Sequence, residues 1–108
     1  MRYMLLICAA EGIEVPPEDS DVQPWVDEMD GRGVRVIGNR LRPVSDSTTV
    51  RIRQGEVLLS DGPYAETKEQ IAGFDIIECA DLDEAVEVAS KHPVARFGTV
   101  EVRPFWVE

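Results

Sequence analysis

Apolar residues occupy both the odd and the even positions of residues 3–9. Successive side chains of a strand point to opposite faces, so this pattern predicts a strand that is covered on both faces. We therefore expect residues 3–9 to form a central strand of the main sheet.

Two later segments have the apolar spacing of helices. In the first, which is short, the apolar positions follow i, i+3, i+4, i+7 and are Val22, Trp25, Val26 and Met29. Ser20 and Gln23 form a capping-box pattern before it, and glycines at 31 and 33 are expected to end it.

The second helix is expected to begin at Asp81, capped by Asp81 with Glu84, and to end before Pro93. Its predicted buried stripe is Leu82, Ala85, Val86 and Ala89.

The remaining apolar segments have the two-residue period of strands. The predicted strands are residues 34–37, 48–53, 56–60, 73–79 and 98–104, with a helical turn at 65–70. Residues 48–53 and 56–60 form a hairpin across Gln54-Gly55, with Val50 and Ile52 on one face and two arginines on the other.

This order predicts a single α+β domain over residues 1–108, with a ferredoxin-like β-α-β-β-α-β arrangement, an antiparallel sheet and both helices on one face. The other face of the sheet then needs a cover. In so small a domain the simplest cover is the same face of a second copy, so we expect a homodimer.

The composition and charge of the chain argue against two classes of function, nucleic-acid binding and membrane insertion. The net charge of −10 argues against a direct nucleic-acid binder, because phosphate backbones select basic surfaces. The longest apolar run, Met4 to Ala10, is too short for a membrane span and follows no basic region typical of a signal peptide. We expect a soluble, intracellular protein with no membrane partner.

The charges are unevenly distributed. Residues 11–30 hold eight acids and no base, whereas residues 32–53 hold six arginines and one acid. One interpretation is that the two segments neutralise each other or are solvated. The other is an arginine-lined site for a small anionic ligand in residues 32–53.

Few residues can hold a metal. Cys8 and Cys79 are far apart in apolar runs, which is typical of buried free thiols. With His92 as the lone histidine they cannot form a zinc or iron–sulfur site, and we expect no cofactor. His92 is expected to be charged at a helix end rather than catalytic.

Asp61 is the best candidate for catalysis. An aspartate before Gly-Pro either caps its own turn or serves as a general acid or base at the end of a strand. Tyr64 and Lys68 follow closely and are candidates for substrate binding, although Lys68 is also placed to pair with a neighbouring glutamate.

Glu101 and Arg103 lie two residues apart and so share one face of the last strand. They form either an ion pair in an interface or the wall of a polar cleft, in which Arg103 would hold an anionic group. Asp75 interrupts an apolar strand and is expected to need an arginine partner, for which Arg51 and Arg53 are the candidates.

Several of these motifs, taken in order, resemble the DGPF-domain branch of the YCII-related family. They are Asp61-Gly62-Pro63, Glu66-Thr67-Lys68-Glu69, Gly73-Phe74, Asp81-Leu82-Asp83-Glu84-Ala85 and Glu101-Val102-Arg103-Pro104. The resemblance implies a dimeric α/β barrel, a bacterial origin and a cytoplasmic location, but no established reaction.

Related YCII proteins carry a proposed histidine–aspartate active site. Asp61 matches the aspartate, but no histidine lies near it in the sequence, and Tyr64 replaces the phenylalanine of the motif. The resemblance also implies an extracytoplasmic-function sigma factor as a candidate partner.

Three functions remain open at this point. The first is a dimeric protein that binds a small anionic or carbonyl compound near Asp61 and, if it is an enzyme, uses Asp61 as acid or base. The second is a non-catalytic regulatory module beside a sigma factor. The third is a dimer in which the motif residues serve the fold alone.

Overall fold

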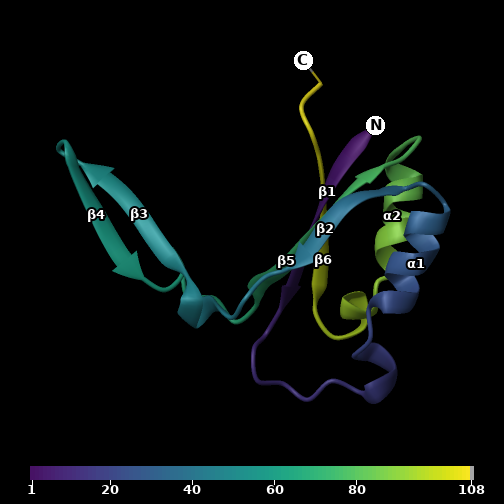
Figure 1. Cartoon of the computed structure of the whole chain (residues 1–108), viewed down its shortest axis with the longest axis horizontal. Helices are drawn as coiled ribbons and strands as arrows, with labels where there is room; N and C mark the ends of the chain where they lie inside the picture. Colours follow the sequence, from purple (N-terminus) through teal and green to yellow (C-terminus); the bar gives the residue numbers. More distant parts are fainter. Residues whose placement is uncertain (108) are drawn as a thin grey trace.

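A computed structural model describes residues 1–107 and has an α+β architecture consistent with the ferredoxin-like fold. One antiparallel sheet has the strand order β2-β5-β1-β6, and two helices cover one of its faces (Figure 1). The elements are β1 (Arg2–Ala9), α1 (Gln23–Gly31), β2 (Arg35–Arg40), β5 (Gln70–Glu78), α2 (Leu82–Ser90) and β6 (Thr99–Pro104). None of the helices in this part of the chain has the length and apolar character needed to cross a membrane.

The predicted hairpin is confirmed as a separate two-stranded sheet of β3 (Thr48–Arg53) and β4 (Glu56–Asp61). It is inserted between β2 and β5, and it extends away from the body on the side of the sheet opposite to the helices (Figure 1). The turn at Gln54-Gly55 has positive φ at both residues, which is the backbone geometry of a tight two-residue hairpin turn. Residues 1–107 also contain three short 3-10 turns, at Pro17–Asp19 (η1), Val44–Asp46 (η2) and Pro93–Arg96 (η3).

Strand β1 is central, as its two apolar faces predicted. It pairs with β5 on one side and with β6 on the other. Tyr3, Leu5 and Ile7 are buried on the helix side, whereas the alternate residues 4, 6 and 8 are half-buried on the opposite side. That opposite side is the open face of the sheet.

The helices complete the core, but α2 presents a different stripe from the predicted one. Its buried residues are Ala85, Val88 and Ala89, whereas Leu82 and Val86 are about half exposed. The rotation of α2 is fixed by α1, because the indole nitrogen of the buried Trp25 donates a 3.0 Å hydrogen bond to the carbonyl oxygen of Val88.

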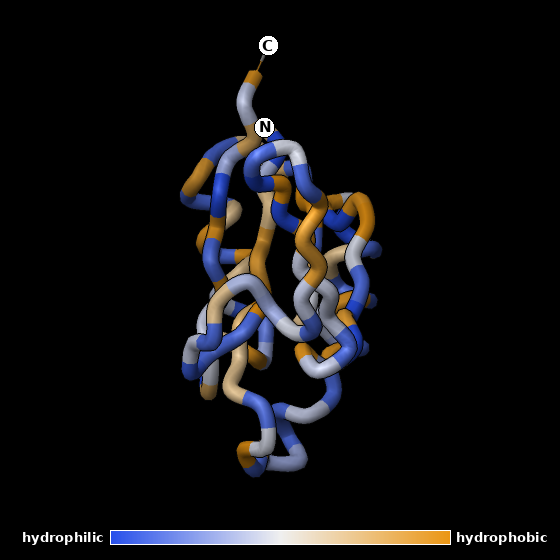
Figure 2. Tube along the Cα trace, turned by 90° about the vertical axis from the view of Figure 1, so that its left-hand side faces the viewer, coloured by the Kyte–Doolittle hydropathy of each residue, from blue (hydrophilic) through white to orange (hydrophobic). Residues whose placement is uncertain are grey.

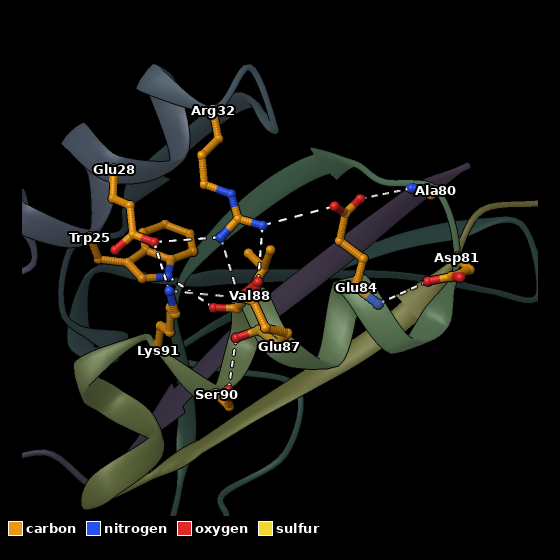
Figure 3. Close-up of polar contacts among 10 residues, drawn as sticks. All are labelled: Trp25, Glu28, Arg32, Ala80, Asp81, Glu84, Glu87, Val88, Ser90 and Lys91. Carbon is orange, nitrogen blue, oxygen red and sulfur yellow. Dashed lines mark hydrogen bonds and ion pairs between the residues drawn. The ribbon is translucent and has the colours of Figure 1, made fainter.

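The two predicted helix caps have different outcomes. The Asp81 cap is confirmed: the Glu84 amide donates to Asp81 Oδ1 at 2.9 Å, and the Glu84 carboxylate accepts from the Ala80 amide (Figure 3). The Ser20 capping box is wrong, because the Ser20 hydroxyl donates to the Pro17 carbonyl within η1. Helix α1 begins after Val22, which provides no side-chain cap, and the Gln23 amide instead donates to Asp21 Oδ1 at 3.0 Å.

The predicted helical turn at residues 65–70 is also wrong. The segment is irregular, and Gln70 already belongs to β5. The Gln70 side-chain amide donates to the carbonyl oxygens of Ala65 and Thr67, both at 3.1 Å. These bonds give the carbonyl groups partners without a helix.

The acidic and the arginine-rich segments partly neutralise each other, in agreement with the first of the two interpretations. Arg32 pairs with Glu28 and with Glu87 of α2, and Lys91 pairs with Glu28 (Figure 3). Hydrogen bonds from Lys91 and Arg32 hold the pKa values of Glu28 and Glu87, respectively, below their usual range. These exposed pairs join the ends of the two helices and contribute little stability each.

The open face has no cover within the described residues. Cross-strand pairing places Met4, Ile76 and Ile37 in one row and Leu6 and Phe74 in the next. Figure 2 views the molecule from the hairpin side and shows apolar stretches of the trace beside polar ones. An uncovered apolar sheet face of this kind is typical of an interaction surface.

Candidate functional site

A cavity of about 690 Å³ lies at the end of the sheet where β1 ends and β5 begins. Its walls come from the ends of β1, β2 and β5, from the loop before α1, from α1 itself and from η3. The lining residues that give the cavity its chemical character are Ile7, Val26, Arg40, Asp75, His92 and Phe97. The volume is in the range of sites that hold small organic ligands.

A buried ion pair forms part of the wall. Strand alternation places Asp75 on the helix side of β5, opposite Leu5 and Gly38, where it is 6% exposed. Arg35 donates to Asp75 Oδ1 through Nε at 2.9 Å and to the Gly38 carbonyl through Nη2 at 3.1 Å. Burial raises the pKa of Asp75, and the Arg35 guanidinium partly offsets this by favouring the carboxylate.

The expectation that Asp75 needs an arginine is confirmed, but the predicted partners are wrong. Arg51 and Arg53 lie on the hairpin, away from β5, and the partner is Arg35 of β2. The register of β2 against β5 shifts between Arg35 and Ile37. Such a bulge re-aims a side chain, which explains why simple alternation did not identify Arg35.

His92 is buried, 3% exposed, and its ring meets that of Trp25 edge-on at 4.7 Å between centroids. Its Nδ1 accepts a 3.1 Å hydrogen bond from the Val94 amide at the start of η3. An accepting Nδ1 places the proton of the neutral ring on Nε2. Burial lowers the pKa of His92 to about 4, so the expectation of a charged histidine at the helix end is wrong.

The Nε2–H of His92 is the polar group that the ring offers to the cavity. No hydrogen bond joins Nε2 to the described residues, whereas every fully buried side-chain nitrogen or oxygen among them has a partner. Nε2 therefore retains some accessible surface, and the ring lines the cavity. The site presents a fixed hydrogen-bond donor on a neutral ring.

Arg40 is the cavity-lining cation without an ion-pair partner among residues 1–107. The other charged residues of the wall are engaged, since Asp19 pairs with Arg96 and Arg42 with Asp46. The Glu11 carboxylate accepts from the Val44 amide. Arg40 and Glu11 are therefore the charged side chains of the wall without an ion-pair partner in the described chain, and of the two only Arg40 also lacks a side-chain hydrogen bond there.

The five residues predicted from sequence lie elsewhere, and none lines the cavity. Asp61 ends β4 at the base of the hairpin, followed by the 79% exposed Tyr64 and by the exposed Lys68. Glu101 and Arg103 pair with each other on the open face of β6. The structure thus brings together Glu101 and Arg103, but places them apart from Asp61.

The residues that build the cavity gave weak signals in the sequence. Asp75 was detectable as an acid in an apolar strand, and Arg40 as one arginine of six in residues 32–53. His92 could not be found by its position, because only the turn at Pro93 carries it into the core.

The described part of the chain has no cluster of side chains that could hold a metal ion. No group of three His, Cys, Asp or Glu side chains converges there. Cys79 is buried and Cys8 is half-buried, both as free thiols, and burial raises the pKa of each. A raised pKa keeps a thiol protonated and a poor nucleophile.

The lowered pKa of His92 predicts that the free energy of unfolding depends on pH. Its pKa is lowered on folding, so the unfolded chain binds a proton below pH 6.5 that the folded chain does not bind until about pH 4. We expect the free energy of unfolding to fall by about 2 kcal/mol between pH 7 and pH 4.5 through this residue. The raised pKa of Asp75 acts in the opposite sense.

The measurement is urea denaturation at several pH values, with His92→Asn as the comparison. Asparagine is a good cap for a helical turn and does not titrate. His92 is the lone histidine, so the slope above pH 4.5 should decrease in this variant. An unchanged slope would show that His92 is not buried as a neutral ring.

Comparisons with known proteins show which family the chain resembles. The YCII-related domain matches residues 1–107. A 67-residue stretch is 48% identical to an uncharacterised protein of Rhizobium meliloti (strain 1021), and it covers 60% of this chain and 54% of that protein. The match thus spans about half the length of the relative.

Proposed function

The chain belongs to the YCII-related domain family, and from this premise we propose that it binds a small organic anion in the cavity beside His92. The observation that carries the proposal is a buried neutral histidine whose Nε2–H has no partner among the described residues and whose ring lines the cavity. Because this N–H keeps accessible surface at the cavity, it is open to an acceptor on a ligand, and a bond to an ionised oxygen would be stronger than one to a neutral acceptor.

The cavity selects for the chemistry of its ligand. Ile7, Val26 and Phe97 provide apolar walls that suit an apolar body. The His92 Nε2–H can donate to a carboxylate or carbonyl oxygen, and the Arg40 guanidinium supplies positive charge. A carboxylate on a small apolar body meets all three features, which supports a monocarboxylate as the ligand class.

Arg35 serves the site in another way. Its Nε and Nη2 already donate to Asp75 and to the Gly38 carbonyl. It therefore holds the β2–β5 wall of the cavity, while Arg40 remains free to meet a ligand. This difference separates a structural arginine from a binding arginine on the same strand.

We also propose that a second copy covers the open face, giving a homodimer packed sheet to sheet. The apolar rows through Ile76 and Phe74 support this proposal, because they have no cover within the described chain. In such a dimer the Glu101–Arg103 pair would lie at or near the interface. Acid–base catalysis by Asp61, with Tyr64 and Lys68 as binding residues, stays a prediction of the sequence.

Isothermal titration calorimetry with benzoate tests the ligand site. We expect Arg40→Gln to weaken benzoate binding by roughly tenfold, because one charge-assisted contact is lost. Arg51→Gln, on the hairpin, is the matched control and should leave the affinity unchanged. Benzyl alcohol, the neutral analogue, should bind more weakly than benzoate. Equal affinities for both variants would contradict the proposed site.

A further inference from the structure

The hairpin β3–β4 has two chemically different faces. Paired residues of the two strands share a face, and Val50 pairs with Leu59 and Ile52 with Val57. These four residues form the hairpin apolar face and are 60–68% exposed. The opposite face carries Arg51 and Arg53 and is mostly polar.

This face has nothing to pack against within the described chain. The hydrogen bonds that tie the hairpin to its flanking segments lie near its base, where Thr49 donates to the Gly62 carbonyl and the Gly62 amide to the Ser47 carbonyl. An isolated two-stranded hairpin is marginal in water. An amphipathic hairpin that stands away from its own core therefore indicates a docking surface.

The direction of the hairpin identifies where its partner lies. It extends on the open-face side of the sheet, opposite to the helices (Figure 1). A partner protein bound to the open face would therefore be within reach of the hairpin as well. The hairpin and the open face therefore lie on the same side of the described chain.

The area of the open face argues for a contribution from the hairpin. Four strands about 4.8 Å apart and about 20 Å long give a projected area of roughly 400 Å². A stable interface buries about 800 Å² of surface on each partner. The hairpin, two strands wide, extends the contact by roughly half of the sheet area.

Charge is compatible with a second copy as the partner. The chain carries a net charge of −10, which opposes self-association, but residues 48–61 are neutral, with two arginines, one glutamate and one aspartate. The hairpin can therefore approach an acidic copy of the same chain without added repulsion. A hairpin from each copy would bind the other in a two-fold arrangement.

We propose that the hairpin apolar face packs against a second copy of the chain, so that each copy clasps the other. This inference rests on the proposed sheet-to-sheet dimer. It assigns the hairpin, which lies outside the core fold, a role in holding that dimer together.

Sedimentation equilibrium of the full chain tests the hairpin contact. Leu59→Asp places a charge on the hairpin apolar face and should raise the dimer dissociation constant at least about tenfold. Leu58→Asp, the adjacent residue on the opposite face, is the matched control and should change it by less than about threefold. Both side chains are exposed, so both variants should fold, which circular dichroism checks.

Ile37→Asp, on the open face, separates the two proposals. If it weakens the dimer while Leu59→Asp and Leu58→Asp behave alike, the clasp is overturned and the sheet-to-sheet dimer stands. If Leu59→Asp alone weakens association, the hairpin contact is supported and the sheet contact is overturned. A wild-type chain that is monomeric at all concentrations overturns both.

Hydrogen exchange gives a second readout that does not depend on substitutions. We expect the amides of β3 and β4 to exchange slowly at concentrations where the dimer is populated and quickly on dilution. Fast exchange in the dimer would contradict the clasp, and the face would then be available to a different protein.

Discussion

Gly38→Ala is expected to lower the free energy of unfolding by about 3–5 kcal/mol, as when one partner of a buried ion pair is removed. A Cβ atom at this position would lie 1.9 Å from Asp75 Oδ1 and 2.8 Å from the carbonyl oxygen of Phe74. The Phe74 oxygen belongs to the backbone of the neighbouring strand and cannot rotate away. The Asp75 carboxylate would have to leave Arg35, and the β2–β5 wall of the cavity would open.

Urea denaturation followed by far-ultraviolet circular dichroism measures this loss. Gly31→Ala is the control, because Gly31 ends α1 without a positive φ and a Cβ atom added there would meet nothing within 4 Å. Alanine is the better helix former, so Gly31→Ala should be neutral or stabilising by up to about 1 kcal/mol. Similar losses in both variants would show that Gly38 is not required by close packing.

Arg35→Met is expected to cost about 3–5 kcal/mol at pH 7, because it leaves the carboxylate of Asp75 buried and unpaired. Methionine retains much of the apolar stem of arginine, so the packing changes less than the charge. The loss should decrease as the pH falls from 7 towards 4. Burial already raises the pKa of Asp75 above its unfolded value, and without Arg35 nothing offsets that effect.

The direction of this pH dependence of stability follows from the number of protons bound by the folded and the unfolded chain. A carboxyl whose pKa is raised on folding binds more protons in the folded chain, so folding becomes less favourable as the pH rises through the unfolded and folded pKa values. Arg32→Met is the control, since its partners Glu28, Glu84 and Glu87 are exposed and such pairs contribute little stability each. A loss from Arg35→Met that is independent of pH would show that Asp75 is not the group left unpaired.

The fold was largely predictable because its pattern is local. The two apolar faces of residues 3–9 identified β1 as central, and the Asp81–Glu84 spacing located the start of α2. The buried stripe of α2 was not predictable, since Val86 and Val88 are equally apolar. Contact with Trp25 of α1 selects Val88, and that contact depends on tertiary structure.

The candidate site was harder to predict because it depends on how distant segments meet. Asp75 was recognised as an acid that needs a partner, but a bulge in β2 selects Arg35. His92 follows a helix and was expected to be charged, yet it caps η3 from inside the core. Neither the bulge nor the direction of the turn at Pro93 has a clear signature in the sequence.

Nitrogen-15 nuclear magnetic resonance of the single histidine tests the proposed ligand site most directly. At pH 7 we expect one neutral imidazole with its proton on Nε2, and we expect the Nε2–H signal to shift on addition of benzoate, less so in Arg40→Gln. An imidazolium at pH 7, or an Nε2–H signal that does not move while benzoate binds, would contradict the proposed site.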